Sequence, residues 1–305
     1  MKIKTKVNIN AIFSSPQNKN TYDAFLIIAG SGKVDHNGDA KGMPLKIYKE
    51  LSDYLVELGF ATLRYDKRGV GESEGSFLEV GLQELLEDID GLVDYLKSRK
   101  DVKRVFLLGH SEGCILSSIY HMSHDIDGMI QLGGAGTSLK SALLSQNLVV
   151  LEEIERFRGI RGWLIKKLIT KEKIIKSQTK IFEKVERSEK TVLRVQLMRL
   201  NAKWMREHFK YTDAMILERL KTTPIKTLCI SGSKDVQANP KDLEVIKNLG
   251  NPNIQVKVIE NMDHVLRQYT GDKTILKAKK QYMNEINKPL HPELLQSLSD
   301  FIKEL

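Results

Sequence analysis

The stretch from Leu107 to Leu116, LLGHSEGCIL, places a serine between two glycines at the junction of two apolar runs. The run before it, RVFLLG, is short and continuously apolar, which is typical of a strand buried on both faces of a sheet. The run after it, EGCILSSIYHM, is predicted to be a helix. A buried strand that passes at once into a helix constrains the chain to a layered arrangement of strands and helices.

The rest of the first half repeats this alternation. Apolar runs typical of strands lie at 24–30, 60–66 and 126–133, and helical patterns lie at 44–59 and 83–99. Residues 2–13 alternate polar and apolar side chains, which predicts an exposed antiparallel edge strand. The order of these elements indicates an α/β fold with a mostly parallel, doubly wound central sheet and helices on both faces.

The pattern changes after Gly136. From about residue 138 to residue 221 the sequence is helical in character, has no proline and has no strand pattern, and long helices are predicted over 174–209. Strand patterns return at 224–232 and 254–260, and helical patterns return at 240–250 and 292–305. We therefore expect an α/β core of residues 1–136 and 222–305, interrupted by a helical insertion at residues 137–221.

Charge is distributed unevenly along the chain. The formal net charge is +9, and residues 151–210 alone contain 17 Lys or Arg against 8 Asp or Glu, a difference of 9. The insertion therefore carries the whole excess, and the rest of the chain is close to neutral. The Lys and Arg residues of the insertion are interspersed with glutamates, and no nucleic-acid-binding motif is present, so a nucleic-acid partner is not expected.

Cysteine use and hydropathy bear on the compartment. Cys114 and Cys229 both lie in apolar surroundings, so we expect core residues in a reducing environment and not a disulfide framework. The N-terminal stretch lacks the apolar core of a signal peptide, and no run approaches about 18 apolar residues. A cytoplasmic protein without stable membrane insertion is the expectation.

The central serine has the surroundings of a nucleophile. Gly109-His110-Ser111-Glu112-Gly113 is a G-x-S-x-G sequence in the strand–turn–helix context that this motif requires. Such a sharp turn strains the serine backbone and holds the hydroxyl above the sheet, and side chains two residues away on either side would collide with backbone. The amides of the following helix favour developing negative charge. Ser111 is therefore predicted to attack a substrate, whereas the alternative is an ordinary strand-to-helix turn.

A nucleophilic serine needs a base, and the base needs an orienting carboxylate. In this architecture both should follow later strands, in the order serine, acid, histidine. Asp235 comes just after the strand that ends at Gly232, and His264 comes just after the strand that ends near Glu260. Asp263 is the nearest competing acid, but adjacent side chains diverge, so Asp235 is predicted to orient His264.

With GHSEG, SGSKD and NMDH in these places, the chain resembles α/β-hydrolase-fold enzymes over about residues 2–136 and 224–305. The stretch LRYDKRGVGES, residues 63–73, is similar to the segment after the fourth strand in many members, where Asp66 and Arg68 are expected to fix the loop. The loop AGSGKVDHNGD, residues 29–39, is similar to the Gly-Ser-Gly loop of a bacterial esterase subgroup. This resemblance implies an oxyanion hole formed by the backbone N–H groups of Ser31 and Glu112.

The resemblance also suggests residues around the substrate. His36 lies in the oxyanion loop and His110 is expected to pack beside the nucleophile, so both are candidate pocket residues. His121, His124 and Asp125 have helical spacing but lack a fourth ligand, so a solvent-facing helix end is favoured over a metal site. Several apolar residues of the insertion are expected in its core, where some of them can also face substrate: Leu197, Met198, Trp204, Met205 and Phe209.

The sequence thus predicts a serine hydrolase of the carboxylesterase kind, in which the insertion forms a cap over the active site. The expected partner is a small acyl ester, no metal or organic cofactor is required, and the oligomeric state is left open. An acyl thioesterase or acyltransferase with the same triad is the first alternative. The second is a binding protein on a hydrolase scaffold, whose basic face docks on nucleic acid or an acidic membrane.

The basic residues of the insertion allow two interpretations. They can simply keep exposed helices soluble, or some of them can attract an anionic group of the substrate. Arg199, Lys203 and Arg206 follow spacings of four and three residues, which predicts that they share one face of a helix.

Overall fold

The structure is a computed structural model that describes residues 1–195 and 198–305. An eight-stranded sheet has the strand order β1-β2-β4-β3-β5-β6-β9-β10. The β1–β2 and β2–β4 pairs are antiparallel, and all other pairs in this sheet are parallel. The strands are β1 (Lys2–Lys4), β2 (Asn8–Ser14), β3 (Tyr22–Ile28), β4 (Ala61–Tyr65), β5 (Val102–His110), β6 (Gly128–Leu132), β9 (Lys226–Gly232) and β10 (Ile254–Ile259).

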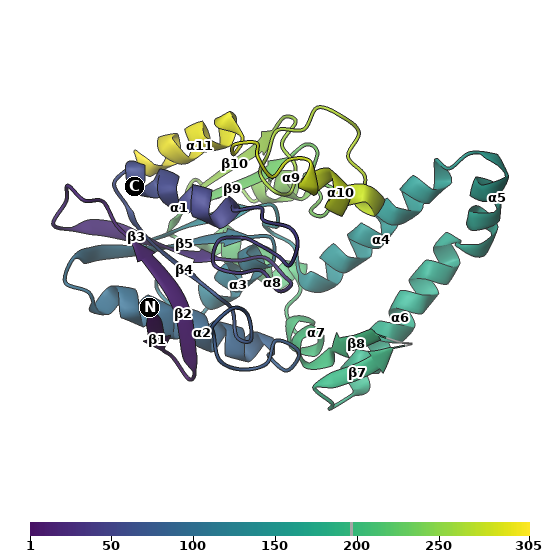
Figure 1. Cartoon of the computed structure of the whole chain (residues 1–305), viewed down its shortest axis with the longest axis horizontal. Helices are drawn as coiled ribbons and strands as arrows, with labels where there is room; N and C mark the ends of the chain where they lie inside the picture. The colour runs from purple at the N-terminus through teal and green to yellow at the C-terminus, as the bar shows by residue number, and fades with distance from the viewer. Residues whose placement is uncertain (196–197) are drawn as a thin grey trace.

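Helices cover both faces of the sheet (Figure 1). The central strand β5 shows how the two layers form, because Val105 and Leu107 enter one apolar core while Phe106 and Leu108 enter the other. A strand buried on both faces must be continuously apolar, and the predicted doubly wound sheet is confirmed. One core includes residues of α2 (Leu82–Ser98), α3 (Glu112–Tyr120), α8 (Asp213–Thr222) and α9 (Asp242–Lys247), and the other includes residues of α1 (Ile47–Glu57), α10 (Ala278–Met283) and α11 (Pro292–Ile302).

The inserted segment, residues 137–221, leaves the sheet after β6 and returns at β9. Its helices α4 (Leu139–Glu155), α5 (Gly159–Leu168) and α6 (Lys171–Arg187) form a projecting arm (Figure 1). In the figure α4 runs away from the sheet, α5 lies at the far end, and α6 runs back to α7 (Ala202–His208). We call α4–α6 the arm.

The long helices predicted over 174–209 are confirmed for α6 and α7 but are wrong between Arg187 and Ala202. The strands β7 (Val192–Val195) and β8 (Met198–Asn201) pair antiparallel there, with Leu193 opposite Leu200. Leu193 is buried in a small apolar cluster with Phe182 of α6 and Met205 of α7. The β-branched side chains of Val192 and Val195 suit a strand, and packing of Leu193 against the two helices fixes the hairpin.

The hairpin also changes the place of three basic residues. Arg199 lies on β8, whereas Lys203 and Arg206 lie on α7, so the three do not share one face of a helix. Lys203 forms an ion pair with Glu84, and Arg206 donates to the carbonyl of Ser188 at 2.5 Å. These two bases join segments of the protein, which leaves Arg199 as the one of the three that borders a cavity.

The apolar residues expected in the core of the insertion have different surroundings. Met205 is buried and Phe209 packs against the same cluster, as predicted. Met198 is 71% exposed, so its predicted core position is wrong. Trp204 reaches the site described below, and Leu197 lies outside the described residues.

Cys114 and Cys229 are both buried and free, as expected for core residues. The reducing, cytoplasmic environment inferred from them stays a prediction. His121 is also buried, with its Nε2 atom 2.8 Å from the hydroxyl of Thr223, so this part of the helix end does not face solvent. No helix in residues 1–195 and 198–305 is long and apolar enough to cross a lipid bilayer.

Candidate active site

Ser111 occupies a strained turn between β5 and α3, which we call the elbow (residues 109–113). Its backbone has φ 55° and ψ −118°, a region that a side chain makes costly. A Cβ atom added at Gly109 would lie 2.3 Å from the carbonyl oxygen of Gly113, and one added at Gly113 would lie 2.1 Å from that of Ile28. Both glycines are therefore required by close backbone contacts, as the sequence predicted.

Asp235 and His264 meet at the carboxyl ends of β9 and β10. The Nδ1 atom of His264 lies 2.8 Å from Oδ2 of Asp235, and both residues are buried. The other oxygen of Asp235 accepts the amides of Gln237 and Ala238 at 2.8 and 2.9 Å, which fixes the carboxylate. Burial disfavours protonated His264, but the charge and hydrogen bond of Asp235 outweigh it and raise the pKa of His264 above its usual 6.5.

The competing acid, Asp263, is used elsewhere. It is fully buried, and its Oδ2 atom lies 2.5 Å from Nζ of Lys273. Its Oδ1 atom accepts the amides of Val265 and Arg267 at 3.1 and 3.0 Å. Asp263 therefore holds the loop after β10 together, while Asp235 contacts the histidine.

Hydrogen bonds of His110 link three loops around the site. The amide of Gly30 donates to the hydroxyl of Tyr48 at 2.8 Å, and that hydroxyl lies 2.9 Å from Nδ1 of His110. The Nε2 atom of His110 lies 2.9 Å from the carbonyl oxygen of His264. Burial, with a contribution from His264, lowers the pKa of His110 to about 3, so a neutral ring accepts from Tyr48 and donates to His264.

The ring of His110 is thus engaged within the protein and is not among the residues that line the cavities at Ser111. The same holds for His36, whose Nδ1 atom lies 2.8 Å from Oδ1 of Asp66. Asp66 also accepts the side chain of Asn10 at 2.8 Å, and Arg68 binds a buried aspartate of α2. Asp66 and Arg68 fix loops as expected, whereas the pocket role predicted for His36 and His110 is replaced by a positioning one.

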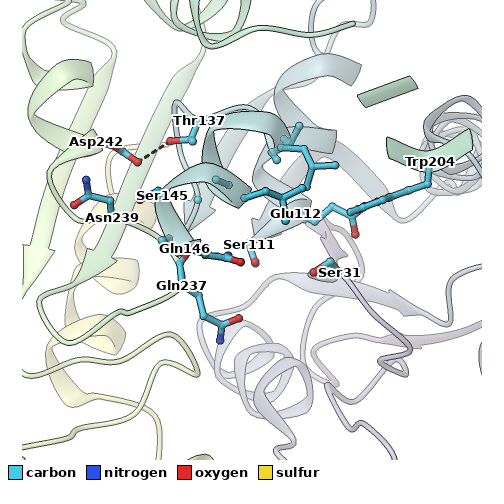
Figure 2. Close-up of a pocket in the computed structure, with 17 residues that line it drawn as sticks. Ser31, Ser111, Glu112, Thr137, Ser145, Gln146, Trp204, Gln237, Asn239 and Asp242 are labelled. Atoms are coloured by element: carbon cyan, nitrogen blue, oxygen red, sulfur yellow. Dashed lines mark hydrogen bonds between the residues drawn. The ribbon is translucent and has the colours of Figure 1, made fainter. Parts of the chain in front are cut away.

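Ser111 opens on a cavity of about 130 Å³, shown in Figure 2. A second cavity of about 310 Å³ has a mostly apolar lining that includes Phe77, Leu78, Val80, Leu85 and Leu200. Ser31, Glu112 and Trp204 line both cavities. The two cavities therefore adjoin at the residues that the sequence predicted for an oxyanion hole.

The backbone amides of Ser31 and Glu112 are free for a ligand. Within the described residues neither amide donates a hydrogen bond, and Glu112 is the first residue of α3. A Cβ atom added at Gly30 would lie 3.1 Å from Cβ of Ser111, so the loop that carries Ser31 contacts the elbow directly. Two amides without a partner in the described residues thus belong to residues that line the cavity at Ser111, and an oxyanion hole there stays a prediction.

The side chain of Glu112 has a role that the sequence did not indicate. Its buried carboxylate accepts Nε1 of Trp204 at 2.6 Å and lies 3.4 Å from Nε2 of His208 and 3.2 Å from Nζ of Lys67. Lys67 also donates to the carbonyl of Gly30 at 2.5 Å. Burial opposes the charge of Glu112, but Lys67, His208 and Trp204 outweigh it and lower its pKa.

This cluster joins the oxyanion loop, the elbow and α7 of the inserted segment. Its members are far apart in the sequence and follow no motif, so only the fold brings them together. The one signal available from the sequence was the presence of Lys67 and Glu112 in segments predicted to be buried. Such charged side chains are rarely buried without partners.

Comparison with known proteins agrees with this architecture. A family model described as serine aminopeptidase, S33, matches residues 42–268. Esterase EstD of Thermotoga maritima is 28% identical over 261 residues, which cover 85% of this chain and 58% of EstD. The chain therefore spans less than two thirds of that relative's length.

Two solved structures share the fold. Est1E from Butyrivibrio proteoclasticus, with ferulic acid bound, has a TM-score of 0.63 at 16% identity, and the match covers 100% of this chain and 98% of Est1E. The Pyrococcus furiosus esterase Pf2001 has a TM-score of 0.57 at 12% identity, over 100% of this chain and 91% of Pf2001. Since the family model covers more than half of the chain, the chain belongs to the Hydrolase_4 family and has the α/β-hydrolase fold.

Proposed function

We propose that this protein is a serine hydrolase that cleaves carboxylic esters. The observation that carries the proposal is the contact of 2.8 Å between His264 and Asp235, at the sheet edge where Ser111 is held at φ 55°. A strained serine, a histidine and a buried carboxylate on three neighbouring loops are the parts of an acyl-transfer site. The relative EstD and the structural neighbour Pf2001 are both named as esterases, which supports the same chemistry.

In the proposed reaction the hydroxyl of Ser111 attacks the ester carbonyl while Nε2 of His264 accepts its proton. Asp235 accepts a hydrogen bond from Nδ1–H and stabilises the imidazolium. The amides of Ser31 and Glu112 bind the oxyanion, each lowering the barrier by about 3–4 kcal/mol. His264 returns the proton to the leaving alcohol, which leaves the acyl group on Ser111. Water then attacks this acyl-enzyme while His264 accepts its proton, and the proton passes to the Ser111 oxygen as the acid leaves.

We infer that the inserted segment, residues 137–221, acts as a cap. Its helix α4 reaches the loop after β9, where Gln146 donates to the carbonyl of Gln237 at 2.9 Å. Its helix α7 reaches the elbow through Trp204 and Glu112. These contacts cover the cavity from both sides, which would exclude water during the reaction. The larger, apolar cavity would then hold an apolar chain of the ester.

The family description, serine aminopeptidase, also suggests a second function: a peptidase that binds the free amino terminus of its substrate. Such a substrate needs a carboxylate that is not already neutralised. Of the two carboxylates that line the Ser111 cavity, Glu112 is paired with Lys67, and Asp242 accepts a hydrogen bond from the hydroxyl of Thr137 at 2.8 Å. Both carboxylates therefore already have partners within the described residues, and we favour the ester.

A substrate panel tests the proposal. It comprises p-nitrophenyl esters of increasing acyl length, an acyl-CoA thioester and an aminoacyl p-nitroanilide, run beside labelling with a fluorophosphonate. We expect ester hydrolysis and an adduct at Ser111, both lost in Ser111→Ala and retained in Ser145→Ala, a serine that lines the same cavity. An adduct elsewhere, or full activity in Ser111→Ala, would contradict the site. Faster turnover of the thioester would favour the thioesterase alternative.

A further inference from the structure

The far end of the arm exposes a stripe of large apolar side chains. On α5, Ile160, Trp163, Leu164 and Leu168 are 80%, 60%, 47% and 69% exposed. Counted from Ile160, these positions are i, i+3, i+4 and i+8, so the side chains lie on one face of the helix. Four exposed large apolar side chains on one helix face are unusual on a protein unless something covers them.

Positive charge lies within and beside this stripe. From Arg156 to Lys171 the sequence contains six Lys or Arg and no Asp or Glu. Lys166 and Lys167 are exposed, and Nζ of Lys167 lies 5.3 Å from the ring centre of Trp163. Within the described part of the chain neither lysine forms an ion pair, whereas Lys140, at the base of the arm, pairs with a glutamate of α6.

The position of α5 allows it to meet a flat surface. Figure 1 shows the helix at the end of the arm that is farthest from the sheet, with α4 and α6 leading back to the core. The elbow and its cavities lie at the other end of the inserted segment, where Trp204 and Gln146 line them. Contact through α5 would therefore leave the site uncovered.

We propose that α5 docks this protein on the surface of an anionic lipid bilayer. An apolar face that contains a tryptophan, together with exposed lysines, is the composition of helices that lie in the lipid interface. The apolar stripe would enter the acyl boundary and the lysines would contact anionic headgroups. The contact is peripheral, because a helix of 10 residues is too short to span a bilayer.

The alternatives fit these residues less well. A second copy of the chain would bring two basic stripes together, and like charges repel at short range. Nucleic acid would match the charge but would leave Ile160 and Leu168 in water. The proposal does not depend on the proposed esterase activity, because none of its residues lines the Ser111 cavity.

Vesicle binding tests the proposal directly. The whole 305-residue chain is mixed with vesicles of phosphatidylcholine alone, or of phosphatidylcholine and phosphatidylglycerol in equal amounts, and binding is measured by sedimentation and by Trp163 fluorescence. We expect binding to the anionic vesicles, weakened by salt, with a blue shift of emission. The shift should disappear in Trp163→Phe, because Trp204 is the only other tryptophan and lies at the elbow.

Matched variants separate the apolar and charged contributions. Ile160→Ser/Trp163→Ser/Leu164→Ser and, separately, Lys166→Gln/Lys167→Gln should each weaken binding by more than about tenfold. Two control variants change exposed residues outside the inserted segment: Val245→Ser/Val258→Ser removes apolar side chains, and Lys2→Gln/Lys4→Gln removes charge. Both should bind as the unchanged protein does. Ser111→Ala should also bind normally, so that loss of activity and loss of docking remain distinguishable.

Circular dichroism and melting temperature establish that the variants are folded. The proposal is overturned if the protein does not bind anionic vesicles, if it binds neutral vesicles equally, or if the triple serine variant binds fully. Light scattering provides another decisive result. A dimer that the triple serine variant converts to monomers would identify the stripe as a contact between copies, and would overturn lipid docking.

Discussion

The elbow and the tip of the arm differ in how tightly their glycines and apolar side chains are packed. At the elbow a Cβ atom on Gly113 would collide with the backbone of Ile28, and residues 105–110 of the flanking strand β5 are buried. At the tip, Gly159 has no described heavy atom within 4 Å of its Cβ position, and Leu168 is 69% exposed. The elbow is fixed by packing, whereas the tip gains little from it.

The difference reflects two requirements, a fixed geometry at the elbow and an accessible surface at the tip. A reacting hydroxyl has to be held within a fraction of an ångström, which requires dense packing around it. A helix that meets a soft partner needs exposed side chains and tolerates local movement. The inserted segment has both properties, because Trp204 is anchored at the elbow while Trp163 is 60% exposed.

The largest expected effect is on the acid of the proposed triad. Asp235→Asn should lower kcat by about 10⁴, because the amide no longer stabilises the imidazolium and favours the wrong tautomer of His264. Asp263→Asn is the matched control, a buried carboxylate next to the same histidine in sequence. It should lower stability through the loss of its pair with Lys273, but kcat of the folded protein should change little. Kinetic assays of ester hydrolysis measure kcat of both variants. A large loss of kcat in Asp263→Asn with a small loss in Asp235→Asn would assign the acid to Asp263.

Glycine substitutions compare the two regions directly. Gly113→Ala should destabilise the protein by about 3 kcal/mol and displace Ser111, because backbone must move to admit the methyl group. Gly159→Ala, where φ is 75° but space is open, should cost only about 1 kcal/mol and leave kcat unchanged. Urea unfolding and ester hydrolysis measure both. Equal losses at the two positions would refute the contrast drawn above.

The pH profile sharpens the account of the elbow. His264 must be neutral to accept the serine proton, and Asp235 raises its pKa. The value of kcat/KM should therefore fall about tenfold per pH unit on the acid side, with a midpoint above 6.5. In Asp235→Asn the midpoint should move to lower pH, because the stabilising charge is gone. A midpoint that stays in place would mean that another group titrates.

The smallest effect is expected at the tip. Leu168→Ala should change the free energy of unfolding by less than about 0.5 kcal/mol, since the side chain is exposed. Leu107→Ala, the same substitution at a fully buried residue of β5, should cost about 2–5 kcal/mol. Thermal unfolding of the two variants suffices. A large loss at Leu168 would indicate packing at the tip, and would weaken the case for a docking surface.

Local pattern predicted the sheet well, because strands buried on both faces, such as β5, leave little ambiguity. The order of Ser111, Asp235 and His264, each after a predicted strand, was equally readable, and the structure brings Asp235 and His264 together. The hairpin β7–β8 was missed because its stability depends on packing against α6 and α7. The pairing of Glu112 with Trp204 could not be predicted, since it joins residues that only the path of the insertion brings together.

The hydrogen bonds from Gly30 through Tyr48 and His110 to His264 have a consequence for protein engineering. Exchanging one of these loops for that of a relative would leave a buried donor or acceptor without its partner, at a cost of about 1–3 kcal/mol. The loops should therefore be transplanted as one cassette, with Tyr48 included. The inserted segment is more easily exchanged, provided that its replacement supplies an indole or another donor to Glu112.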